Sequence, residues 1–186
     1  MVIIYEEGKL RANAEFLPPS SERITPRRLR RGFYVGECCA IAIGGQLPLA
    51  KKIPEILPTL AMAVMSFEQT DEFSLPEGVM NDDIWFCDKH ETVYVIMTLK
   101  GLYYFGKTEG FVTLDHCQLH SFGPMSPTFM VAMRALDNVD DAMAAVAEFT
   151  RGVGRDYLIF ERDKLKPEFH YDPDANYDRW IWPVEV

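Results

Sequence analysis

The order of its strand-like and helix-like segments restricts the fold of this chain more than any other feature of the sequence. Apolar residues recur at helical spacing in three segments, of which the last two follow each other directly: 49–67, 127–136 and 140–152. Aromatic and β-branched residues punctuated by tight turns, a pattern typical of strands, fill four further segments: 2–13, 32–45, 84–122 and 156–163. Because the helices are grouped rather than alternating one by one with strands, the sequence predicts an α+β fold with antiparallel sheets and helices outside them.

Turn and capping residues mark where several of these segments begin and end. A turn-like EEGK stretch separates the first two strands, and tight turns are predicted at Lys100-Gly101 and at Glu109-Gly110. Ser126 is predicted to be the N-cap of the helix 127–136, with Pro127 as its first residue. The strands on either side of each turn are therefore expected to pair as hairpins.

The composition favours one domain that is neither disordered nor attached to a membrane. Of the 186 residues, 48% are hydrophobic and 12% aromatic, which is enough for a buried core. The net charge of −9 argues against attraction of the whole surface to nucleic acid or to anionic membranes. The chain lacks both the run of roughly 18 apolar residues that crosses a bilayer and the basic start of a signal peptide. We therefore expect a cytoplasmic protein.

Three stretches, taken in order, carry a resemblance to a known family. IIYEEGKLRANAE looks like a first hairpin with a glycine turn, and GFYVGECCAIAIGGQ looks like two later strands that end in glycine before a helix. LHSFGPMSPTFMVAMRALDNVDDAMAAVAEFTRGVGRD looks like a strand, a Ser/Gly turn, a helix of small residues and a second helix followed by Arg-Asp. Over residues 1–161 this order resembles the proteasome β-subunit and its bacterial relative HslV. The resemblance implies a four-layer αββα sandwich of the N-terminal-nucleophile type.

The chemistry of that family depends on the residue at the start of the first strand. There a Thr, Ser or Cys attacks the substrate while its own free α-amine takes the proton. This sequence has Met1 and Val2 at that place, and neither side chain is a nucleophile. The family's aspartate near the end of the hairpin matches Asn13, and its buried lysine matches Arg31, whose permanent charge cannot serve as a tunable amine.

Two supporting positions of the family keep their residue type. Ser121 matches the serine of the turn, and Asp156 matches the aspartate of the Arg-Asp pair, although Ile159 stands where the family has a further serine. Asp156 is also the expected partner of Arg31, because an unpaired buried charge costs several kcal/mol. The resemblance therefore implies a catalytically inactive, oligomeric protein that acts as a structural or interaction module, with itself or another protein as partner.

Two alternatives to the inactive module stay open at this point. Removal of a leader could expose a new first residue and give an active threonine-type or cysteine-type peptidase; the candidates are Ser20, Ser21, Thr25, Cys38 and Cys39. An arginine-rich loop could instead bind the phosphate or carboxylate groups of an acidic partner, or nucleic acid, through bidentate hydrogen bonds. Its members are Arg23, Arg27, Arg28, Arg30 and Arg31.

The remaining polar residues do not predict a metal or another cofactor. On a strand, His116 and His120 would lie four residues apart at about 3.3 Å per residue, too far to share a zinc ion. The acidic stretch from Asp172 to Asp178 lacks the glycine and the glutamate of a calcium-binding loop. We therefore expect neither a metal site nor a cofactor.

The end of the sequence, residues 162–186, is predicted to be an extension rather than part of the domain formed by residues 1–161. It contains several large apolar side chains: Tyr177, Trp180, Ile181, Trp182 and Val184. These are too apolar to lie free in water, so we expect the extension to pack on the domain or on a partner subunit.

Overall fold

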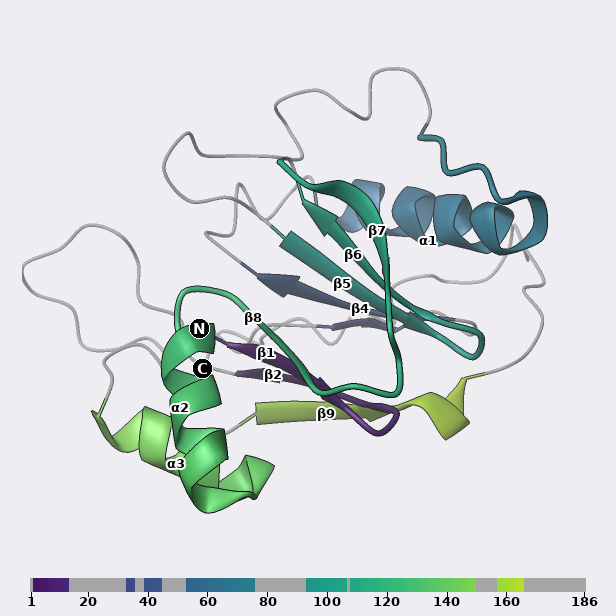
Figure 1. The fold of residues 1–186 in the computed structure, drawn as a ribbon. Coiled ribbons are helices and arrows are strands. Elements are labelled where there is room, and N and C mark those ends of the chain that lie inside the picture. Colours follow the sequence, from purple (N-terminus) through teal and green to yellow (C-terminus); the bar gives the residue numbers. More distant parts are fainter. Residues whose placement is uncertain are drawn as a thin grey trace, which may run out of the picture.

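The computed structural model of the protein describes residues 2–13, 33–35, 39–44, 53–75, 93–106, 108–149 and 157–165. These residues form two antiparallel sheets and three α-helices (Figure 1). The predicted α+β class with antiparallel sheets is therefore confirmed.

Each sheet is assembled from strands that pair with their neighbours in antiparallel register. The four-stranded sheet contains, in spatial order, β8 (His120–Phe122), β1 (Ile3–Glu6), β2 (Lys9–Asn13) and β9 (Tyr157–Glu161). The five-stranded sheet contains β3 (Phe33–Val35), β4 (Cys39–Gly44), β5 (Val93–Thr98), β6 (Leu102–Gly106) and β7 (Gly110–Leu114). The helices are α1 (Ile53–Thr70), α2 (Ser126–Leu136) and α3 (Val139–Phe149), and a short 3₁₀-helix, η1 (Arg162–Lys164), follows β9.

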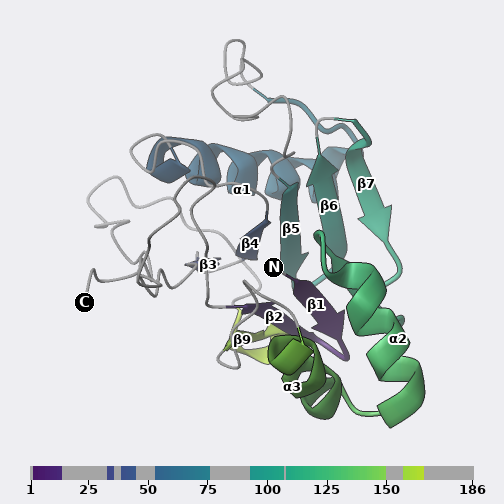
Figure 2. The same cartoon turned by 90° about the vertical axis from the view of Figure 1, so that its left-hand side faces the viewer.

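The helices cover the outer faces of the two sheets. Figure 2 shows α1 along the five-stranded sheet, and α2 with α3 on the opposite side of the molecule, next to β1 and β2. None of the helices in the described ranges is long and apolar enough to cross a membrane.

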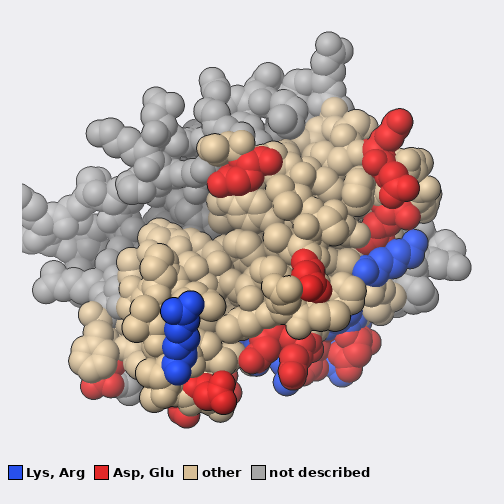
Figure 3. All heavy atoms as spheres, viewed as in Figure 1, with Lys and Arg blue, Asp and Glu red and all other residues tan. Residues whose placement is uncertain are grey.

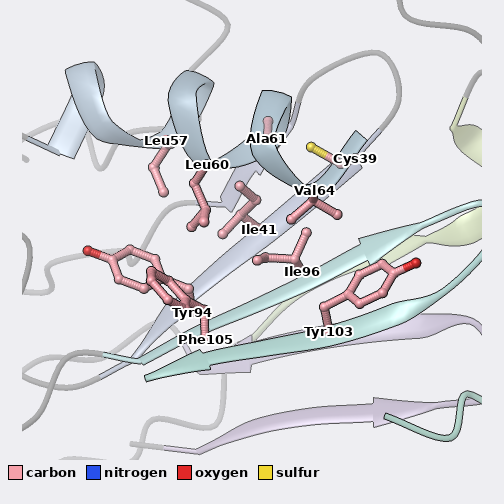
Figure 4. Packing of buried hydrophobic residues seen from close by; sticks show 10 residues of the cluster. All are labelled: Cys39, Ile41, Leu57, Leu60, Ala61, Val64, Tyr94, Ile96, Tyr103 and Phe105. Carbon is pink, nitrogen blue, oxygen red and sulfur yellow. The ribbon is translucent and has the colours of Figure 1, made fainter. Parts of the chain in front are cut away.

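Buried side chains form three separate clusters between these elements. The first lies between α1 and the five-stranded sheet, where leucines and a valine of the helix meet strand residues (Figure 4); it includes Ile41, Leu57, Leu60, Val64, Tyr94 and Ile96. The second lies between the two sheets and includes Ile3, Tyr5, Leu10, Val95, Met97 and Leu102. The third lies between β1 and the helix pair α2 and α3, and includes Val2, Ile4, Phe129, Met143 and Val146.

The clusters explain why some strands are continuous apolar runs instead of alternating apolar and polar residues. Successive side chains of a strand point to opposite faces. In β1, Ile3 belongs to the cluster between the sheets, whereas Ile4 belongs to the cluster under the helices. In β4, Ile41 faces α1 and Ala42 faces the other sheet. Both faces of these strands are buried, so both sets of side chains are apolar.

The predicted hairpin turns are confirmed. The turn between β1 and β2 has positive φ angles at Glu7 (46°) and Gly8 (78°), the combination that a tight hairpin requires at its two central residues. β5 and β6 are joined across Thr98 and Gly101, where the Thr98 N–H donates to the Gly101 carbonyl oxygen at 3.0 Å. Gly110, at the start of β7, also has a positive φ of 71°.

The start of α2 differs from the sequence prediction, whereas that of α3 agrees with it. α2 begins at Ser126, and its N-cap is Met125, which makes no capping hydrogen bond through its side chain. The Ser126 hydroxyl instead donates to the carbonyl oxygen of Ser121, 2.9 Å away. α3 begins at Val139, which confirms the predicted start near residue 140. The Asn138 side chain, which the sequence analysis did not name, caps this helix by accepting a hydrogen bond from the Asp141 N–H at 3.0 Å.

Candidate functional site at the start of β1

The register of the four-stranded sheet places three chain segments side by side at the start of β1. Ile3 pairs with Ala12 of β2 on one side and with Phe122 of β8 on the other. The start of β1 is therefore flanked by the last residue of β2, Asn13, and by the end of β8, after which the chain turns into α2. This is the place at which the resembled family holds its nucleophile.

The side chains at the start of β1 are packed as core. Val2 and Ile4 are both 0% exposed, and they contact Phe129 of α2 and the Ala142 and Val146 side chains of α3. Ile3, also 0% exposed, points into the cluster between the sheets. Hydrocarbon side chains in these positions can neither attack a carbonyl group nor transfer a proton.

Ser121 lies within β8, opposite Ile4. The family resemblance had implied that Ser121 lies in the turn after this strand. The turn follows at Gly123–Met125, where Gly123 has a φ of 98°. The Ser121 and Ser126 hydroxyl groups form a short hydrogen bond with each other. Because the single hydroxyl proton of Ser126 is donated to the Ser121 carbonyl oxygen, Ser121 is the donor between the two hydroxyl groups. Both protons are thus used inside the connection between β8 and α2.

The other predicted site residues cannot be positioned from the described part of the chain. Asn13 is the last residue of β2, and its backbone pairs with Tyr157 of β9. The structure does not describe the Asn13 side chain. Arg31 and Asp156 lie outside the described residues, so their pairing stays a prediction. The same holds for the rest of the arginine-rich loop, namely Arg23, Arg27, Arg28 and Arg30, and for the residues that processing could expose, except Cys39, which is buried in β4.

His116 is placed differently from its prediction. It lies in the turn between β7 and β8 and not on a strand, whereas His120 begins β8 and its Nε2 lies 2.6 Å from the Asp115 carbonyl oxygen. The described ranges contain no group of three or more residues that could hold a metal ion. Hydrogen bonds from the Cys117 N–H and the Gln118 side chain hold the pKa of the exposed Asp115 below its usual range.

Sequence reasoning missed a half-buried carboxylate that joins α1 to the five-stranded sheet. Oε1 of Glu68, in the last turn of α1, accepts hydrogen bonds from Thr98 and from the Tyr103 hydroxyl, the latter at 2.9 Å. Burial of Tyr103, followed by its hydrogen bond to Glu68 and the charge of that residue, raises the pKa of the phenol. The only sequence signal is that Glu68 follows Val64 at helical spacing on the face that α1 buries.

Arg11 is a second polar residue that the sequence reasoning did not identify. It is 6% exposed, and its Nη1 lies 3.3 Å from Oε2 of Glu6. The ion pair joins neighbouring strands on the face opposite Leu10 and Ala12, which point between the sheets. The alternation of charged and apolar residues in KLRAN predicts that Arg11 points away from the face that carries Leu10 and Ala12. The register of β1 with β2 then brings Glu6 next to Arg11.

Two antiparallel sheets with α-helices, and a first strand that starts between the ends of its neighbours, make a fold that is similar to that of proteasome-type N-terminal-nucleophile hydrolases. Solved structures of this type are similar to the chain. HslV from Trypanosoma brucei aligns with a TM-score of 0.58 and 10% identity, over 86% of this chain and 98% of that chain. BPH from Thiobacillus denitrificans, solved in complex with epoxomicin, aligns with a TM-score of 0.55 and 16% identity, over 86% and 95%.

At these identities the likeness is one of fold. No protein-family model and no curated protein matches the sequence. The resemblance inferred from the order of the sequence segments is therefore confirmed at the level of the fold.

Proposed function

We propose that this protein is a proteasome-like module without peptidase activity, which acts in the cytoplasm as a structural or interaction component. The observation that carries the proposal is the packing at the start of β1. Val2, Ile3 and Ile4 are hydrocarbon side chains with 0% exposure at the place where the chemistry of this fold needs a reachable Thr, Ser or Cys. A substrate carbonyl group cannot approach a position that α2 and α3 already fill.

The proposed architecture is the four-layer αββα sandwich. Its support is the alternation of the three buried clusters: one between α1 and the five-stranded sheet, one between the sheets, and one between the four-stranded sheet and the helix pair. We take residues 1–161 as the domain and residues 162–186 as an extension. Leu165, which is 6% exposed in the cluster between the sheets, supports an extension that starts by packing on the domain.

The proposal includes self-association. Three large apolar side chains of the helix pair are exposed to solvent: Val131 (68%), Leu136 (46%) and Phe149 (85%). Isolated exposed apolar residues are common, but three of them on two packed helices favour a surface that a second subunit covers.

The test is an assay of the purified full chain with fluorogenic peptides, using HslV as the active control. We expect no turnover above the buffer rate, and we expect incubation with epoxomicin to leave the intact mass unchanged. Hydrolysis that disappears when the α-amine is blocked would overturn the proposal. A mass shortened to a chain beginning at one of the five residues that processing could expose would favour the processed peptidase instead.

A further inference from the structure

The end of the sheets away from the start of β1 contains a shallow cavity, open to solvent, of about 600 Å³. It is formed where the turn between β1 and β2, the turn between β7 and β8, and η1 meet (Figure 1). Its lining residues include Lys9, Leu99, His116, Glu161 and Arg162. A volume of this size suits a small organic molecule.

Arg162 is held in the wall of this cavity by three contacts. Its backbone N–H donates to the Gly8 carbonyl oxygen at 2.8 Å, which fixes η1 against the turn between β1 and β2. Its Nη2 donates to the Tyr5 hydroxyl, also at 2.8 Å, and its guanidinium carbon lies 5.6 Å from the centre of the Tyr5 ring. The Tyr5 hydroxyl in turn donates to the His116 carbonyl oxygen at 3.0 Å, so the guanidinium is oriented by a group that is itself fixed.

The charge of Arg162 is not paired within the described part of the chain. Its Nε is buried without a hydrogen-bond partner there, and no described carboxylate lies within ion-pair distance. The nearest acids in sequence, Glu161 and Asp163, each lie 4.0 Å from Lys164 Nζ. A guanidinium carries five N–H donors, so an oriented guanidinium with one of them on a phenol can still bind an anion.

The other lining residues select the kind of anion. Leu99 supplies apolar surface, whereas Tyr5 is 0% exposed and acts by orienting the guanidinium. The carboxylates of Glu7, Glu161 and Asp163 also line the cavity, and acidic and basic side chains lie close together along the lower edge of the molecule in Figure 3. These carboxylates repel an anion of high charge more strongly than a single carboxylate.

We propose that this cavity binds a small organic monocarboxylate, with its carboxylate on the guanidinium of Arg162 and its apolar body against Leu99. The inference is independent of the proposed function, because it uses no residue near the start of β1. It adds a ligand site at the opposite end of the two sheets.

The test is a titration of the full chain with phenylacetate, followed by amide NMR, beside the uncharged analogue phenylacetamide. We expect phenylacetate to shift the amide signals of Gly8 and Arg162, and phenylacetamide to bind at least about tenfold more weakly because it lacks the charge. Equal binding of the two compounds, shifts confined to other regions, or no binding at all would overturn the proposal. Inorganic phosphate that binds as tightly as phenylacetate would also overturn it.

A pair of variants locates the site. Arg162→Gln should weaken phenylacetate binding at least about tenfold. Lys164→Gln, which changes an exposed cation on the same turn that does not line the cavity, should change it less than twofold. Unchanged affinity in Arg162→Gln would contradict the proposal. If Arg162→Gln does not fold, the comparison of phenylacetate with phenylacetamide on the unmodified protein still tests whether binding depends on the carboxylate charge.

Discussion

The two ends of the sheets differ in the kind of side chain that they gather. The start of β1 is surrounded by Val2, Ile4 and Phe129, each 0% exposed, and by two serines whose hydroxyl protons are used within one connection. The opposite end gathers a guanidinium, a tyrosine hydroxyl and several carboxylates around a cavity. The difference shows that the fold alone does not determine where polar groups gather. Their position depends on which side chains the sequence places at each end of the sheets.

The largest expected effect tests whether the start of β1 is core. Phe129→Ala should lower the free energy of unfolding by about 3–5 kcal/mol, because it opens a cavity against Val2 and Ile4. Met62→Ala, at a 51% exposed position of α1 outside the helix pair, is the control and should change it by less than about 0.5 kcal/mol. Urea denaturation followed by circular dichroism measures both. Similar values for the two variants would mean that the region is not packed as described.

The next effect concerns the polar contact between α1 and the five-stranded sheet. Tyr103→Phe removes the hydrogen bond to Glu68 and should cost about 1.5–3 kcal/mol, as for a bond to a charged group. Tyr104→Phe, which removes a hydroxyl of a half-buried residue 3.4 Å from the exposed Glu109, should cost less than about 1 kcal/mol. The same denaturation measures both variants. If they lower the free energy of unfolding equally, the hydrogen bond to Glu68 does not account for the loss in Tyr103→Phe.

A smaller effect tests the serine pair beside β1. Ser126→Ala removes the hydrogen bond to the Ser121 carbonyl oxygen and should cost about 1 kcal/mol. Ser66→Ala, at an exposed position of α1, should be neutral or slightly stabilising because alanine is the better helix former. If Ser126→Ala were as neutral as Ser66→Ala, the pair would contribute nothing to the connection between β8 and α2.

The smallest effect is a dependence on pH at the polar contact. Burial raises the pKa of Tyr103 in the folded chain, and also that of Tyr94, so each phenol stays protonated when the unfolded chain, with a pKa near 10, has begun to ionise. The folded chain then binds more protons, and stability is complete below pH 10 and falls above it. At pH 10.5 each tyrosine should account for a loss of roughly 0.8 kcal/mol. Tyr103→Phe should lack one such loss, and an identical pH dependence of the two proteins would contradict this.

The order of elements could be predicted from the sequence because the signals for it are local. The glycine turn before Lys9, the turn at Lys100-Gly101 and the apolar spacing of α2 each act within a few residues, and all three are confirmed. A capping signal fails when another nearby group takes the same atom, as when the Ser126 hydroxyl donates to the Ser121 carbonyl oxygen instead of capping α2.

The polar contacts could not be predicted because they join residues far apart in the chain. Tyr5 and Arg162 are 157 residues apart, and only the pairing of β2 with β9 brings the turn after β1 next to η1. Glu68 and Tyr103 meet because α1 packs on the sheet that contains β6. Neither pair follows a motif, so a single sequence carries no sign of them.

The close approach of Gly101 to Tyr103 has a consequence for how homologous sequences can vary. A Cβ atom at position 101 would lie 2.6 Å from Cζ of Tyr103, and the ring is fixed by its hydrogen bond to Glu68 and by stacking on Phe111. A side chain at position 101 therefore requires the ring to move or shrink. Homologues with a residue other than glycine at position 101 should therefore lack tyrosine at position 103, whereas glycine at position 101 places no such restriction on position 103.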